Sequence, residues 1–222
     1  MATVLLTRHG ERIDYVDPDW LSKSGHNRRD DPHLAPKGLQ QARELAERLS
    51  GVAPPLKAIY SSPFVRAVET AHIIAEVLSL EVCVEPGICE VLTRCFPPEF
   101  LATSTLCESF PLISKTYVPV VPPNELGPES SDASSSLLRL IISQASLSCP
   151  RPHQPPPGSV LFVGHGASCA GITEALCGRW SYMGLCTLST FVKRGGTGSP
   201  FTMLGKGGDA AHLSDPTNLR AY

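Results

Sequence analysis

The chain has 222 residues, of which 42% are apolar and 18% are charged, and its net charge at pH 7 is −2. This composition excludes a wholly disordered chain, and it excludes a broadly basic surface that would attract nucleic acid or an anionic membrane. Any phosphate group must therefore be recognised by a few placed cations. No apolar run reaches the ~18 residues of a membrane span, and residues 1–6 lack the pattern of a signal peptide. We expect a soluble cytoplasmic protein, with the nucleus as the other option.

Eight cysteines are spread along the chain, and no two of them form a Cys-x-x-Cys pair. This spacing predicts neither a zinc site nor a dense disulfide framework. We interpret most of the cysteines as small buried apolar residues in a reducing compartment. The sequence indicates no metal site and no cofactor.

Buried strands alternate with amphipathic helices in the first part of the chain. Apolar residues at helical spacing indicate the helices, and short β-branched runs indicate the strands. In chain order, the predicted elements are a strand at 3–7, a polar loop at 10–36, a helix at 36–49, a strand at 58–60, a helix at 64–80 and a strand at 81–84.

The stretch 97–157 has a different composition, because it holds 12 of the 21 prolines and 11 serines. Each proline removes a backbone donor, so a core strand or helix would not tolerate this number. We interpret the stretch as an irregular cap inserted into the domain. Within it we expect a mobile part at 103–132, a helix at 133–147 and a stiff linker at 150–158.

The remaining part of the chain returns to alternating strands and helices. A strand is predicted at 159–163, a helix at 167–177 and two strands at 186–193 and 201–204, with a glycine turn at Gly195 and Gly196 and an irregular tail after Gly205. The whole pattern predicts one α/β domain over 1–222, built as a three-layer sandwich with a mainly parallel central sheet.

Polar side chains follow three of the predicted strands directly. In a parallel sheet, ligands bind beyond the carboxyl ends of the strands, so these side chains should meet at one edge. The edge would collect two imidazoles and three guanidiniums, from His9, His165, Arg8, Arg12 and Arg66. Such a cluster would repel itself without an anion, and phosphate fits the guanidinium fork best.

Four motifs in this order resemble the histidine phosphatase superfamily, which includes cofactor-dependent phosphoglycerate mutase. The motifs are Arg8-His9-Gly10, the segment 32–42, Ser62-Pro63-x-x-Arg66 and Gly164-His165-Gly166. Within the superfamily, 8–14 and 84–90 are most similar to the phosphatase domain of the suppressor-of-T-cell-receptor-signalling proteins and to ecdysteroid-phosphate phosphatase. The resemblance implies a phosphoglycerate mutase-like fold.

The resemblance also implies a role for each matching residue. His9 corresponds to the phosphorylated histidine, Arg8 and Arg66 to the two catalytic arginines, and His165 to the second histidine. Arg8, Arg12, Arg66 and His165 would bind the phosphate, and the Ser62 hydroxyl would either join them or cap a helix. Glu90 is the candidate general acid. Two alternatives stay open: Glu90 is a loop carboxylate paired with Arg94, or Glu11 is the acid.

We therefore predict a metal-independent phosphatase that hydrolyses a phosphomonoester through a phosphohistidine intermediate on His9. The substrate would be a phosphorylated small molecule or a phosphoprotein, with no nucleic-acid or membrane partner, and a homodimer is one option. Two other readings remain. One is a mutase-like phosphotransferase, and the other is a binding module that kept the fold and lost the activity.

Overall fold

A six-stranded sheet with the order β3-β2-β4-β1-β5-β6 forms the centre of the molecule. The computed structural model describes residues 2–25, 27–126, 158–194 and 200–220. Strands β1 to β4 are parallel to one another, β5 pairs antiparallel with β1, and β6 pairs antiparallel with β5. The strands are β1 (Ala2–Arg8), β2 (Leu56–Ser61), β3 (Val82–Val84), β4 (Ser159–Gly164), β5 (Leu188–Lys193) and β6 (Phe201–Asp209).

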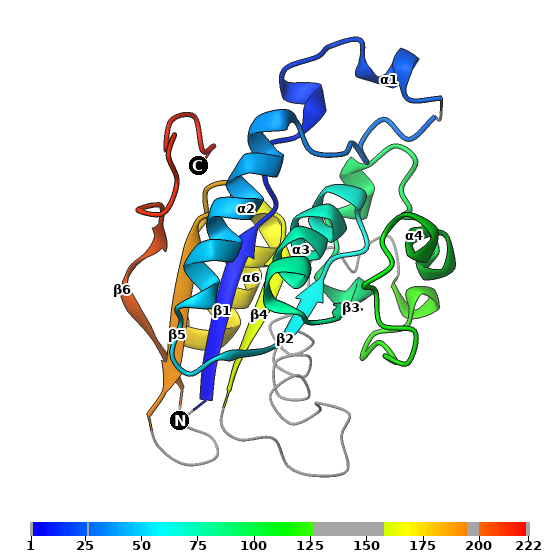
Figure 1. Ribbon diagram of the computed structural model, residues 1–222. Coiled ribbons are helices and arrows are strands. Elements are labelled where there is room, and N and C mark those ends of the chain that lie inside the picture. Colours follow the sequence, from blue (N-terminus) through cyan, green and yellow to red (C-terminus); the bar gives the residue numbers. More distant parts are fainter. Residues whose placement is uncertain (1, 26, 127–157, 195–199, 221–222) are drawn as a thin grey trace.

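Helices cover both faces of the sheet, as Figure 1 shows, with α2 (Pro36–Ser50) and α3 (Val65–Leu78) on one face and α6 (Gly166–Cys177) on the other. Successive side chains of a strand point to opposite faces. Leu5 therefore packs in the core under α2 and α3, whereas Val4 and Leu6 pack under α6. The predicted α/β sandwich with a mainly parallel sheet is confirmed.

Short elements lie in the connections. They are η1 (Ile13–Tyr15) and α1 (Trp20–Lys23) after β1, and η2 (Pro86–Ile88), η3 (Leu92–Arg94), α4 (Thr103–Ser109) and η4 (Pro123–Glu125) after β3. The loop with η1 and α1 rises beyond the end of β1, and the last described part of the tail lies at the same end of the sheet (Figure 1).

In the part of the expected mobile stretch that the structure describes, residues 103–126, the chain forms two short helices, α4 and η4, and is otherwise irregular. Leu106, Ile113 and Val121 are at most 3% exposed and belong to the core. The Ser114 amide donates to the Val82 carbonyl at 2.9 Å, which ties the segment to β3. Pro111 and Pro119 lie between these anchor points, and Pro122 and Pro123 follow Val121 at the start of η4. The expected helix at 133–147, the linker at 150–157 and the turn at 195–196 lie outside the described residues.

The tail beyond Gly205 also differs from the prediction, because β6 continues as a strand to Asp209. Its pairing with β5 shifts register between Leu188 and Thr190. Gly205, Gly207 and Gly208 have positive φ angles of 67°, 74° and 63°. Glycine adopts this region readily, so the strand can bulge and still stay paired. These three glycines, which predict a loop in the sequence, therefore allow β6 to extend to Asp209.

Candidate active site

The carboxyl ends of β1, β2 and β4 bring the predicted residues together. The His9 amide donates to the Gly164 carbonyl at 3.0 Å, and the Ser62 amide donates to the Val163 carbonyl at 3.0 Å. These bonds continue the parallel ladders by one residue. Side chains from three distant parts of the sequence thus face one volume at the end of the sheet.

His9 is buried, and its hydrogen bond fixes its tautomer. The side chain is 1% exposed, and Nδ1 donates to the Gly10 carbonyl at 2.8 Å. Nδ1 therefore carries the proton, and Nε2 keeps its lone pair. Burial, followed by the charges of Arg66 and Arg8, lowers the pKa of His9 well below its usual value. The buried ring is therefore neutral at neutral pH.

The loop after β1 is held tightly against α2 and α3. A Cβ atom on Gly10 would lie 2.7 Å from the Gly38 carbonyl oxygen, so only glycine fits there without a shift. The Gly10 amide donates to Thr70 Oγ1 at 3.1 Å, and this hydroxyl donates to the Arg66 carbonyl at 2.7 Å. Thr70 thus links the histidine loop to the helix that carries Arg66. Sequence reasoning missed it, although it lies one helical turn after Arg66 on α3.

His165 lies beside His9, with ring centroids 5.2 Å apart. Its Nε2 is 2.6 Å from Ser62 Oγ. The Ser62 hydroxyl hydrogen has no other acceptor among the described residues, so we assign the hydroxyl as donor in this bond, while its oxygen accepts the Phe64 amide at 3.4 Å. The Nδ1–H group of His165 then faces the site. Ser62 thus orients His165, whereas the sequence had suggested a phosphate contact or a helix cap.

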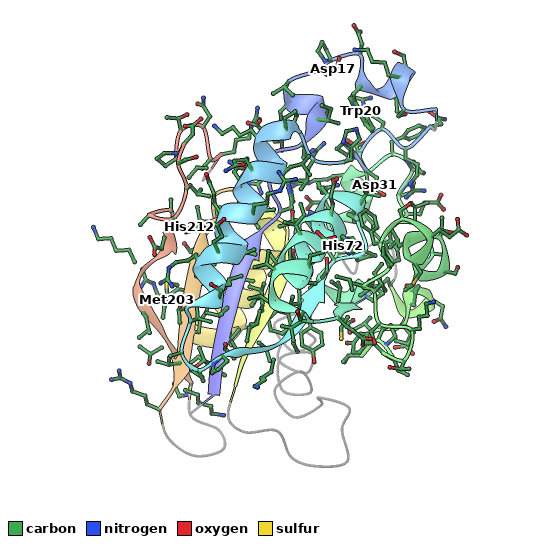
Figure 2. The ribbon with its side chains drawn as sticks, in the orientation of Figure 1. Asp17, Trp20, Asp31, His72, Met203 and His212 are labelled. Carbon is green, nitrogen blue, oxygen red and sulfur yellow. The ribbon has the colours of Figure 1, made fainter. Side chains whose placement is uncertain are left out.

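Arg66 is the largest fully buried side chain of the described residues. Its guanidinium carbon lies 4.8 Å from the Phe64 ring centroid, and Nη1 donates to the Asp30 carbonyl at 3.0 Å. Nη1 also lies 3.9 Å from Asp31, whose carboxylate accepts the first amide of α3, from Val65, at 2.7 Å. Figure 2 shows Asp31 at this end of α3. Asp31 positions the arginine, and no local sequence signal identified it.

The other two arginines are held differently. Arg8 Nη1 donates to the Arg220 carbonyl at 2.9 Å and lies 3.5 Å from the Met183 carbonyl. Arg12 forms a bidentate pair with Asp14, at 2.9 and 2.7 Å. Burial lowers the pKa of Arg12, but the hydrogen bonds to Asp14 and the charges of Tyr15, Asp14 and Glu90 together raise it overall. Arg12 therefore already has a carboxylate partner.

Glu90 reaches the cluster from the loop after β3. Its Oε2 lies 3.5 Å from Arg66 Nη2 and 3.6 Å from His165 Nδ1, and the side chain is 24% exposed. The carboxyl group thus faces Arg66 and His165 rather than Arg94. Within the described residues, Glu11 has no side-chain contact with His9, Arg66 or His165, and its amide donates to Gln41.

Three buried nitrogens in this cluster find no hydrogen-bond partner among the described residues, namely Arg8 Nε, Arg66 Nε and His165 Nδ1. Buried polar groups normally have partners, and each unpaired one costs about 1–3 kcal/mol. Guanidinium and imidazole donors are the groups that bind phosphoryl oxygens. The geometry and the charge of the cluster therefore fit a tetrahedral oxyanion.

Comparison with known proteins agrees with this geometry. The model of the histidine phosphatase superfamily (branch 1) matches residues 4–96, which include β1, α2, α3 and the residues His9, Arg66 and Glu90. Residues 4–96 therefore resemble the histidine phosphatase superfamily (branch 1).

Two curated relatives are similar to most of this chain. One is the human ubiquitin-associated and SH3 domain-containing protein A, 28% identical over 209 residues, covering 79% of this chain and 31% of the relative. The other is ecdysteroid-phosphate phosphatase of Bombyx mori, 26% identical over 207 residues, covering 78% of this chain and 30% of the relative. The chain thus spans about a third of the length of these relatives.

The solved structure of the Bombyx mori ecdysone phosphate phosphatase, in complex with tungstate, has the same fold. Its TM-score is 0.71 at 22% identity, and the match covers 92% of both chains. This likeness supports the fold of the chain.

The described residues contain neither a metal-binding cluster nor a membrane-spanning helix. No group of three or more His, Cys, Asp or Glu side chains is placed to hold a metal ion within 2–25, 27–126, 158–194 and 200–220. No helix in these ranges is long and apolar enough to cross a membrane.

The buried histidines predict how stability depends on pH. Burial, followed by the charge of Arg66, lowers the pKa of both His9 and His165 well below 6.5. Below pH 6.5 the unfolded chain binds protons that the folded chain does not, so the free energy of unfolding must fall. We expect a loss of up to about 1.4 kcal/mol per histidine for each pH unit below 6.5.

Urea unfolding at pH 7.5, 6.5 and 5.5 measures this dependence. The free energy should change little between pH 7.5 and 6.5 and fall between 6.5 and 5.5. In a His9→Asn variant, the free energy of unfolding should fall less between pH 6.5 and 5.5 than in the wild type. A free energy that stays constant or rises toward pH 5.5 would contradict the neutral buried histidines.

Proposed function

We propose that the domain is a metal-independent phosphatase that hydrolyses phosphomonoesters through a phosphohistidine intermediate on His9. The observation that carries the proposal is the bond from His9 Nδ1 to the Gly10 carbonyl at 2.8 Å. It leaves Nε2 with a lone pair in a buried, cationic site, which is the requirement for a nucleophilic histidine.

In the first step, His9 Nε2 attacks phosphorus in line with the leaving oxygen. The P–N bond forms as the P–O bond to the alcohol breaks. Arg8, Arg66 and the Nδ1–H group of His165 stabilise the equatorial oxygens of the transferring group. Their unpaired buried donors support this role, because binding the phosphoryl group would give each of them a partner. The positive charge comes from side chains of this chain.

Glu90 handles the proton in both steps. In its protonated form it gives a proton to the leaving alcohol oxygen. The resulting carboxylate then takes a proton from water, whose oxygen bonds to phosphorus as the P–N bond breaks. His9 returns to its neutral form, and inorganic phosphate leaves. The position of Glu90 between Arg66 and His165, 3.5 and 3.6 Å away, supports this role.

The similar proteins that are phosphatases support hydrolysis over a mutase-like phosphotransfer. The silkworm relative is an ecdysteroid-phosphate phosphatase, and its solved structure holds tungstate. A further curated relative, 37% identical over 91 residues, is phosphoserine phosphatase 1 of Hydrogenobacter thermophilus. We therefore propose a phosphorylated small molecule as substrate, with a phosphoprotein as the other class.

A phosphatase assay with a chelator tests the proposed function. The wild-type protein should hydrolyse p-nitrophenyl phosphate at the same rate before and after prolonged treatment with EDTA, because arginines and His165 supply the positive charge. Loss of activity with EDTA that Mg²⁺ or Zn²⁺ restores would overturn the metal-independent mechanism. Absence of hydrolysis for any phosphomonoester would favour a binding module.

A further inference from the structure

The last described residues of the chain fold back onto the candidate site. The Arg220 carbonyl accepts a hydrogen bond from Arg8 Nη1 at 2.9 Å. The Leu185 amide donates to the Leu219 carbonyl at 2.9 Å, and a Cβ atom on Gly184 would lie 2.9 Å from the Leu219 side chain. The tail is thus packed closely against the segment before β5, and Arg220 lies next to a phosphate-binding arginine.

A second anchor holds the tail on α2. Lys37 Nζ pairs with Asp215 at 2.6 Å and donates to the Thr217 carbonyl at 3.2 Å. Arg220 itself has a φ angle of 52°, in the left-handed region that residues other than glycine rarely adopt. Such conformations persist where the surroundings fix them, and they cluster at functional sites. The backbone of Arg220 is therefore held in a conformation that it would not adopt alone.

The Arg220 side chain adds a fourth guanidinium to the cluster. Its Cζ lies 3.7 Å from the centroid of the Tyr15 ring, and the Cζ of Arg12 lies 5.0 Å from the same centroid. Arg12 is neutralised by Asp14. Among the residues that the structure describes, the Arg220 side chain has no carboxylate or other hydrogen-bond partner, and it makes a cation–π contact with Tyr15. A cation–π contact holds a guanidinium in place without using its donors.

Of the four arginines at this site, Arg8 and Arg220 have no carboxylate partner among the described side chains. The transferring phosphoryl group accounts for Arg8 in the proposed function. The Arg220 guanidinium contacts the same Tyr15 ring as Arg12, and its donors can serve another anion. We propose that Arg220 is a specificity-determining residue, which binds a second anionic group, such as a carboxylate, on the leaving group of the substrate. This inference rests on the proposed function.

Two ligands that differ in one carboxylate provide the test. 3-Phosphoglycerate and glycerol 3-phosphate have the same phosphoester and carbon chain, and only the first has a carboxylate at the far carbon. Binding is measured by calorimetry on the His9→Ala protein, so that turnover does not interfere. We expect 3-phosphoglycerate to bind at least about 10-fold more tightly, since a charge-assisted pair is worth about 10- to 100-fold in affinity.

Substitution of Arg220 in the same background should remove this preference. Arg220→Gln keeps the carbonyl that holds Arg8, so 3-phosphoglycerate should lose about 10-fold or more in affinity and glycerol 3-phosphate much less. Arg220→Lys should restore part of the loss. The matched control is Arg43→Gln, an exposed arginine on α2, which should bind both ligands like the parent protein.

Three outcomes decide the question. A preference for 3-phosphoglycerate that Arg220→Gln removes supports the inference. Equal affinities in the parent protein, or an equal loss for both ligands in Arg220→Gln, would overturn it, the latter because the tail would then only position Arg8. Failure of both ligands and of inorganic phosphate to bind would overturn the inference together with the proposed function.

Discussion

Replacement of His9 by alanine is expected to lower kcat for p-nitrophenyl phosphate by about 10⁴-fold or more. His9 Nε2 offers a nitrogen lone pair to phosphorus, whereas the neutral His165 presents its Nδ1–H group. The fold should remain, since His9 contributes one side-chain hydrogen bond, to the carbonyl of its own neighbour. Steady-state kinetics and circular dichroism on the same preparation measure both effects.

His33 provides the matched control. Its Nδ1 bonds to the carbonyl of the next residue at 2.8 Å, as in His9, but the side chain is exposed and lies outside the cluster. His33→Ala should therefore keep kcat within about twofold of wild type. A His9→Ala protein that is folded and retains a wild-type rate would remove His9 from the mechanism.

Replacement of Glu90 by glutamine should give the second large effect, and its size should depend on the leaving group. An alkyl phosphate needs a proton on the departing oxygen, so kcat/KM should fall by about 10²–10⁴-fold. p-Nitrophenolate leaves without protonation, so kcat/KM for p-nitrophenyl phosphate should fall by less than about 10-fold. The parameter kcat/KM is the appropriate one because it does not include hydrolysis of the phosphohistidine.

Glu11→Gln is the comparison that separates the two candidate acids. Glu11 follows the signature directly, but its main chain is fixed by Gln41 and Ala35, and its side chain does not contact the described cluster. The Glu11→Gln variant should show small and equal decreases in kcat/KM for both substrates. Equal losses for both substrates in Glu90→Gln, together with a selective loss in Glu11→Gln, would assign the acid to Glu11.

The sequence was sufficient to predict the residues at the strand ends. Arg8, His9 and His165 each follow a buried strand, and parallel strands end at one edge of the sheet. Their meeting therefore depends only on recognising the strands. Arg66 comes from the first turn of α3, whose helical pattern is clear in the sequence.

Residues that act through distant contacts were not predictable in this way. Asp31 lies in a polar loop and acquires its role only when the loop packs on α3. Arg220 looks like an ordinary polar tail residue, and only the packing of Leu219 on Gly184 brings it to Arg8. The composition of 103–126 also gave no sign of the contacts that hold this segment on the domain. There, the buried Glu85 carboxylate accepts bonds from Tyr117 and from the amides of Val120 and Val121, which orders a proline-rich segment.

The central claim is that phosphate becomes bonded to the His9 nitrogen during turnover. Rapid alkaline quenching of the wild-type protein during hydrolysis of a ³²P-labelled phosphomonoester, followed by peptide mapping, tests it most directly. We predict an acid-labile, alkali-stable phosphate on the peptide that contains His9, and none on the same peptide from His9→Ala. Active wild-type protein that releases phosphate at the full rate with no label on His9, or with label on another residue, would contradict the mechanism.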